Sequence, residues 1–115
     1  MHLPLTFEKV IENANQLNLY KNLVRQLNKD LRYANIDLVF DEAVLPDSLK
    51  LMLHETIYQL ILERFSDYLN LLYIVDVSEQ KIKELDEDDT LKLSEEVTFL
   101  ILLREWQKVW YKSQN

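Results

Sequence analysis

Glycine and cysteine are both absent from this chain of 115 residues, and proline and histidine each occur only twice. Average usage would supply about eight glycines to a chain of this length. Without glycine the chain lacks the usual residue for phosphate-cradling loops, tight left-handed turns and close approach of the backbone to a ligand. Without cysteine it cannot form disulfides, thiol-based catalytic sites or zinc-thiolate sites. These absences favour long helices with few connections, and a protein that binds rather than catalyses.

The residues that are present indicate a folded helical domain. Leucine occurs 23 times and alanine three times, with 48% hydrophobic and 29% charged residues. This composition is typical of globular proteins and not of disordered ones. The leucine bias predicts packed helices with bulky cores. At this length we expect one domain over residues 1–115.

Two kinds of segment are not recognisable in the sequence. The first residues carry no basic segment followed by a long apolar run, so we expect no signal peptide. The most apolar stretch, residues 49–77, is interrupted by charged residues such as Lys50, Glu63 and Asp67. We therefore expect no membrane association, and a reducing cytoplasm is the simplest location for a chain without cysteine.

Negative charge is concentrated in the middle of the chain. The formal net charge is −7, made up of +1 in residues 1–40, −9 in residues 41–90 and +1 in residues 91–115. Binding to duplex nucleic acid needs several basic contacts with phosphates, so the acidic body argues against a nucleic-acid partner.

Hydrophobic periodicity and capping residues predict the helices. Thr6 is a good N-cap for a helix over about 6–34, which could kink or break near Asn15–Asn18 because asparagine competes for backbone hydrogen bonds. Residues 35–45 are expected to be an irregular, apolar-anchored connection. Pro46 begins a helix over about 47–73 that is apolar on most sides and is therefore expected to be the central element.

The acidic residues that follow suggest two further helix starts. Asp76 and Glu79 fit a capping box for a short helix over about 77–86. Asp89 or Thr90 can cap a last helix over about 90–112. The predicted fold is all-α, a compact bundle of three long helices and one short helix.

Motifs for metal binding or catalysis are weak. His54-Glu55 begins like a zinc-protease helix, but Tyr58 occupies the position of the second histidine. The acidic turn at 84–89 has helices on both sides, yet it lacks the glycine that a calcium loop requires. We expect no catalytic, cofactor-binding or metal-binding residue, and no cofactor.

Self-association is the first functional expectation. The chain holds more large apolar residues than so small a domain can bury, which favours a homodimer. Basic residues also recur every four positions on the first and last long helices, as charged rims for a protein partner. The residues expected to make these contacts are Arg25, Lys29, Leu102, Arg104, Trp106, Lys108, Val109 and Trp110.

Two other functions remain open at this stage. A small enzyme or ligand binder could use the carboxylates of Glu55, Glu63 and Asp67, provided that they face a cavity inside the bundle. A single-stranded nucleic-acid binder could use the basic helix faces, with neighbouring aromatic rings stacking on bases.

Overall fold

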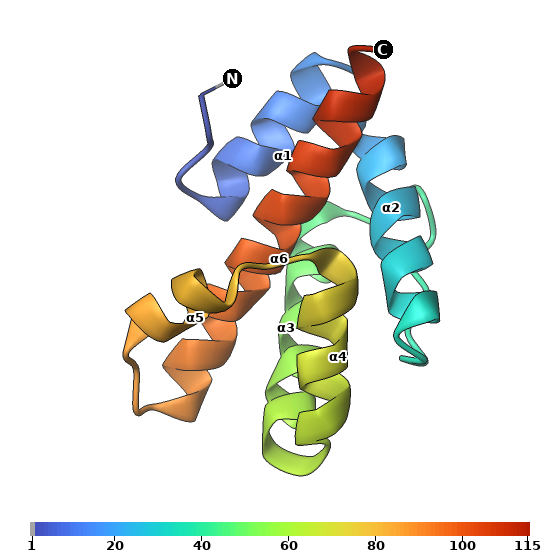
Figure 1. Ribbon diagram of the computed structural model, residues 1–115. Coiled ribbons are helices and arrows are strands. Elements are labelled where there is room, and N and C mark those ends of the chain that lie inside the picture. The colour runs from blue at the N-terminus through green and yellow to red at the C-terminus, as the bar shows by residue number, and fades with distance from the viewer. Residues whose placement is uncertain (1) are drawn as a thin grey trace.

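The chain folds into an all-α globule (Figure 1). This computed structural model describes residues 2–115, and within that range it contains no strand. The helices of the described chain are α1 (Phe7–Gln16), α2 (Tyr20–Tyr33), α3 (Pro46–Glu63), α4 (Phe65–Val75), α5 (Glu79–Leu85) and α6 (Thr90–Ser113).

The segment predicted as one helix over 6–34 forms α1 and α2, with the break at the expected place. Thr6 caps α1, because its Oγ1 accepts a hydrogen bond from the backbone N–H of Lys9 at 3.1 Å. Asn18 has a φ of 58°, in the left-handed region that asparagine tolerates better than most residues. The chain turns there and α2 begins at Tyr20.

The segment predicted as one helix over 47–73 is also divided, at Arg64. This residue has φ −140° and ψ 59°, outside the helical region, and no proline or glycine signals the break. A straight helix with apolar residues on most sides could bury only one of them. Folding back at Arg64 lets α4 bury a face of its own, formed by Tyr68, Leu71, Leu72 and Val75.

The capping residues of the last two helices are partly as expected. Asp89 caps α6 by accepting hydrogen bonds from the N–H groups of Leu91 and Lys92. Asp76 does not cap α5, contrary to the sequence-based expectation. It ends α4 instead, in a left-handed conformation with φ 72°, and Ser78 takes the N-cap position of α5.

The central element is α6, and not the 47–73 segment as the sequence suggested. Its 24 residues run along the middle of the molecule in Figure 1, and it packs against each of the other five helices. It buries a broad stripe that includes Val97, Ile101, Leu102 and Trp106. The stripe faces Leu23 and Leu27 of α2 and Leu53 and Ile57 of α3 within one hydrophobic core.

The connection between α2 and α3 is irregular and anchored by apolar residues, as predicted. Ile36 and Phe40 are buried in the core. The Asn28 side chain pairs with the backbone of Phe40 through two hydrogen bonds of 2.8 Å, as donor to its carbonyl and acceptor from its N–H. This pairing holds the connection against α2.

None of the helices in residues 2–115 is both long enough and apolar enough to cross a bilayer.

Candidate functional site

The apolar residues expected to make partner contacts lie mostly in the core of the single chain. Leu102, Trp106 and Val109 are 0%, 1% and 5% exposed, and Trp110 is half-buried. They hold α6 against its neighbours. Leu102, Trp106 and Val109 are therefore inaccessible to a partner unless the bundle opens.

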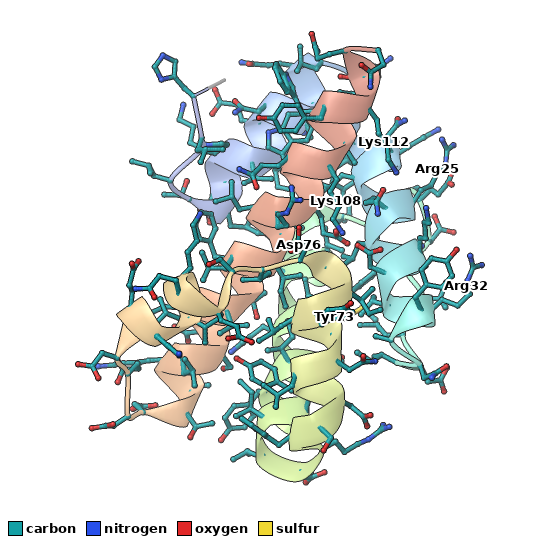
Figure 2. The ribbon with its side chains drawn as sticks, in the orientation of Figure 1. Arg25, Arg32, Tyr73, Asp76, Lys108 and Lys112 are labelled. Carbon is teal, nitrogen blue, oxygen red and sulfur yellow. The ribbon has the colours of Figure 1, made fainter. Side chains whose placement is uncertain are left out.

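Two of the predicted basic residues, Arg104 and Lys108, stabilise the C-terminal end of α4. Arg104 donates to the backbone carbonyl and to a carboxylate oxygen of Asp76, both at 3.1 Å. Lys108 Nζ donates to the carbonyl of Ile74 at 3.4 Å. Cations satisfy the unpaired carbonyls of a helix C-terminus and interact favourably with its dipole. These two residues act inside the fold, and Figure 2 shows Lys108 beside the end of α4 at Asp76.

The other two predicted basic residues, Arg25 and Lys29, lie on the outer face of α2 and are exposed. The Arg25 guanidinium binds both carboxylate oxygens of Glu42. Lys29 forms no ion pair within residues 2–115, and its ammonium lies 5.9 Å from the centre of the Tyr33 ring. Of the eight predicted contact residues, these two are the ones most accessible to another molecule.

A buried polar cluster lies where α2 packs against α6. Lys108 Nζ donates to Asp30 Oδ2 at 2.7 Å, and the Asp30 side chain is 6% exposed. The carboxyl group of Glu105 is completely buried beside this pair. Gln26 donates to Asp30 and accepts from Lys112 at 2.7 Å. Five polar side chains thus form a network in an otherwise apolar interface.

The two carboxyl groups of this cluster have opposite electrostatic environments. The pKa of Glu105 is raised to about 9, first by burial and then by the neighbouring Asp30 carboxylate, whose effect is larger than the opposing effect of Lys108. Burial alone would also raise the pKa of Asp30, but hydrogen bonds from Glu105 and Lys108 hold that pKa below its ordinary value. One proton is therefore retained on Glu105 at neutral pH, next to an ionised Asp30.

Hydrogen bonding agrees with a protonated Glu105. Neither of its oxygens accepts a hydrogen bond, and Lys108 Nζ is 3.4 Å from Oε1, farther than from Asp30. An ionised carboxylate without acceptor partners is costly in the interior, whereas a carboxylic acid can donate its proton to Asp30. The buried part of the cluster then carries one anion, Asp30, and one cation, Lys108, which balance, whereas Lys112 is exposed.

Of this cluster only Lys108 was among the predicted residues, although the sequence carries a signal for Asp30 and Glu105 as well. Asp30 follows Leu23 and Leu27 in the spacing of the core positions of α2, and Glu105 follows Thr98 and Leu102 in α6. An acid in the middle of an apolar helical stripe is expected to be buried and paired.

His54 connects α3 to α6 through a hydrogen bond with Ser94. It lines an open hollow of about 470 Å³ between α1, α3 and α6, and its Nε2 lies 2.7 Å from Ser94 Oγ. The Ser94 hydroxyl donates its only proton to the carbonyl of Leu91, so His54 must donate to Ser94. Ser94 is also fully buried. The pair therefore lacks an exposed hydroxyl that could serve as a nucleophile.

The acidic residues considered for catalysis or metal binding do not converge. Glu55 and Glu63 are exposed, and Asp67 is paired with Arg64 at 2.6 Å. In the acidic turn, Asp89 and Glu87 are engaged with backbone N–H groups. Among residues 2–115, no three histidine, aspartate or glutamate side chains are placed to hold a metal ion.

An exposed apolar row on α4 is the clearest unpartnered feature of the surface. Phe65, Leu69 and Tyr73 follow one another at four-residue spacing and are 54%, 50% and 82% exposed. Residues at this spacing share one helix face. The single charged residue within α4 is Asp67, which is neutralised by Arg64. Outer faces of surface helices are normally charged or polar, so this face is unusual.

Comparison with protein-family models, with curated proteins and with solved structures finds no match to this chain.

Proposed function

We propose that this protein is a non-enzymatic helical interaction module that self-associates, and that two copies meet through the exposed row Phe65, Leu69 and Tyr73 of α4. The observation that carries the proposal is an outer helix face that is apolar and free of net charge. The residues first expected to form the contact, Leu102, Trp106 and Val109, are used in the core instead. Exposed apolar residues occur on several elements, and on α4 three of them form a row along one helix face.

The charge of the chain favours a second copy as the partner on this face. In a two-fold symmetric contact the same surface lies on both sides, so the two faces that meet carry the same net charge. For a chain with a net charge of −7, most faces would repel their own copy. The α4 row avoids this cost because it contains no ionised group, and its acidic neighbour Asp67 is paired with Arg64.

The size of the face indicates a reversible dimer. At 1.5 Å per residue, α3 is about 27 Å long, and two packed helices are roughly 20 Å wide. Leu62, in the last turn of α3, is exposed as well. The surface formed by α3 and α4 together is still smaller than the roughly 800 Å² that each partner buries in a standard interface. We therefore expect a monomer–dimer equilibrium that depends on concentration.

Replacing Leu69 by glutamate should abolish the dimer, since it places a like charge on both sides of the contact. Leu91→Glu is a matched control, because Leu91 is 49% exposed, almost the same as Leu69, but lies on α6. Sedimentation equilibrium of the wild type should give a mass rising with concentration from 13.8 kDa toward twice that value. Leu69→Glu should remain at the monomer mass, and Leu91→Glu should behave as the wild type.

Two results would contradict the proposal. One is a wild-type mass that stays at the monomer value at every concentration. The other is equal weakening of the dimer by Leu69→Glu and Leu91→Glu, which would point to a general charge effect. Urea unfolding checks that both variants are folded. We expect that they are, because both positions are half-exposed and glutamate is a good helix former.

A further inference from the structure

A second surface, formed by the outer face of α2 and the end of α6, has the opposite character. Its cations are Lys21, Arg25, Lys29 and Arg32 of α2 together with Lys112 of α6, and we call it the α2 basic face. No exposed acidic residue lies on α2, because its one acid, Asp30, is buried against Lys108. Figure 2 shows Arg25 and Arg32 along the outer side of α2 and Lys112 close to its upper end.

Six of the thirteen lysines and arginines form an ion pair within residues 2–115, and only one of these six, Arg25, lies on the α2 basic face. Within residues 2–115 the carboxylates of Glu12, Glu8, Asp67 and Asp76 each hold a lysine or arginine. On the α2 basic face, Arg25 alone is paired, with Glu42. Lys29, Arg32 and Lys112 form no ion pair in the described chain, which leaves their charges available to another molecule.

The α2 basic face is also hollowed on both sides of Lys29. One hollow, of about 330 Å³, lies between α2 and the end of α6 and includes Asn22 and Lys112 in its wall. A second, of about 480 Å³, lies between α2 and the connection to α3 and includes Arg32 and Asn35. Lys29 and Arg25 contribute to both hollows. A polypeptide lying across α2 between the two hollows would contact lysine and arginine side chains and the amide groups of Asn22 and Asn35 in turn.

We propose that the α2 basic face binds a short acidic polypeptide segment of a partner protein. From Lys21 to Arg32 the face is about 17 Å long, the length of five or six residues of extended polypeptide. Glutamate or aspartate side chains of such a segment would pair with Lys29, Arg32 and Lys112. Arginine offers a planar fork that matches a carboxylate, and this favours a defined register.

Nucleic acid fits the α2 basic face less well. Two exposed acids of the connection after α2, Asp37 in the wall of the second hollow and Asp41 further along the chain, would repel a long polyanion. Stacking on bases would need a free aromatic ring. Tyr33, the aromatic residue of this face, already has Lys29 at 5.9 Å and Arg32 at 5.7 Å from its ring centre.

The acidic turn of a second copy is a poorer occupant than a separate partner. Asp89 caps α6, Glu87 accepts a hydrogen bond from the Asp89 N–H, and Glu84 accepts one from Gln80. Asp86 and Asp88 are the two acids of the turn without such a bond in the described chain. Two carboxylates cannot match the unpaired cations of the α2 basic face, so a longer acidic segment is required.

Fluorescence anisotropy with labelled hexaglutamate tests this binding directly. We expect saturable binding at low ionic strength that weakens as salt is added. The double substitution Lys29→Glu and Arg32→Glu should weaken the binding of hexaglutamate by about tenfold. Each substitution removes an exposed ion pair with the peptide and adds repulsion between like charges. Lys83→Glu with Lys92→Glu is the matched control, because it makes the same change in net charge at exposed positions outside the face. The control pair should retain most of the affinity.

Four outcomes would overturn the proposal. They are an absence of hexaglutamate binding, equal weakening by the two double variants, tighter binding of an oligothymidylate than of hexaglutamate, and loss of self-association in Lys29→Glu, Arg32→Glu. The third would indicate a nucleic-acid surface and the fourth a second copy as the occupant. Leu69→Glu leaves the α2 basic face intact, so this variant should bind hexaglutamate as the wild type does. Its binding therefore tests the α2 basic face independently of the α4 dimer.

Discussion

Replacing Lys108 by methionine should lower the free energy of unfolding by about 3–5 kcal/mol, the usual cost of leaving one member of a buried ion pair without its partner. Lys108 Nζ is 2.7 Å from Asp30 Oδ2, with both side chains largely buried, and it also donates to the carbonyl of Ile74. Methionine keeps most of the aliphatic stem, so the change reports on the ammonium group and not on packing.

The position of Lys112 provides a control for Lys108. It lies one turn further along α6 and is exposed, and its ammonium donates to Gln26 Oε1 at 2.7 Å. We expect Lys112→Met to cost less than about 1 kcal/mol, because a group at the surface can exchange its hydrogen bond for one to water. Urea unfolding followed by the fluorescence of buried Trp106 measures both variants. If Lys108→Met lowers the free energy of unfolding by less than about 0.5 kcal/mol, the expectation is wrong, because a change of that size is usual for surface substitutions.

The Lys108→Met deficit should also depend on pH. In the wild type, Lys108 and Glu105 hold the pKa of Asp30 below its ordinary value. This pairing adds stability above the ordinary pKa of an aspartate, and the added stability is lost as pH falls through the lower, folded-state value. The difference between wild type and Lys108→Met should therefore be largest near neutral pH and shrink in acid. If Lys108→Met is unfolded at neutral pH, it should regain structure on mild acidification, which would also agree with this expectation.

The sequence was informative where local chemistry decides the structure. Thr6, Asn18 and Asp89 mark ends of helices through hydrogen bonds to nearby backbone groups or through a left-handed conformation, and the expectations at all three are confirmed. The irregular connection after α2 could be predicted because a short run in which Ile36, Leu38 and Phe40 alternate with Asp37, Val39 and Asp41 has no second strand to pair with. Each of these features depends on residues within a few positions of one another.

The sequence was less informative where distant helices decide the outcome. The break at Arg64 has no local signal, and it is explained by the core that α4 fills when the chain folds back. For Arg104 and Lys108, periodicity placed both on a charged helix face. It could not show that the C-terminal end of α4 lies against that face and binds both side chains.

Glu105→Gln should remove most of the pH dependence of stability between about pH 5 and pH 9. The pKa of Glu105 is raised from 4.5 to about 9 in the folded chain, chiefly by burial and then by Asp30. Between these values the folded state holds a proton that the unfolded state has lost. The free energy of unfolding therefore decreases as pH rises, by up to about 1.4 kcal/mol per pH unit for one proton.

A glutamine at position 105 has nearly the shape of the protonated acid and cannot ionise. Its amide can donate to Asp30 as the carboxylic acid does. The stability of Glu105→Gln should therefore change little over this pH range, and the variant should become progressively more stable than the wild type as pH rises. Near pH 8.5 the advantage could approach 4 kcal/mol relative to pH 5.5, by about 1.4 kcal/mol for each of three units.

Urea unfolding at a series of pH values measures this difference, and Glu96→Gln serves as the control because Glu96 is exposed on the same helix. The control should follow the wild-type profile at every pH. Parallel profiles for the wild type and Glu105→Gln would mean that Glu105 is ionised in the folded chain. In that case Lys108 would have to neutralise two buried carboxylates, and the charge balance inferred for the contact between α2 and α6 would be incorrect.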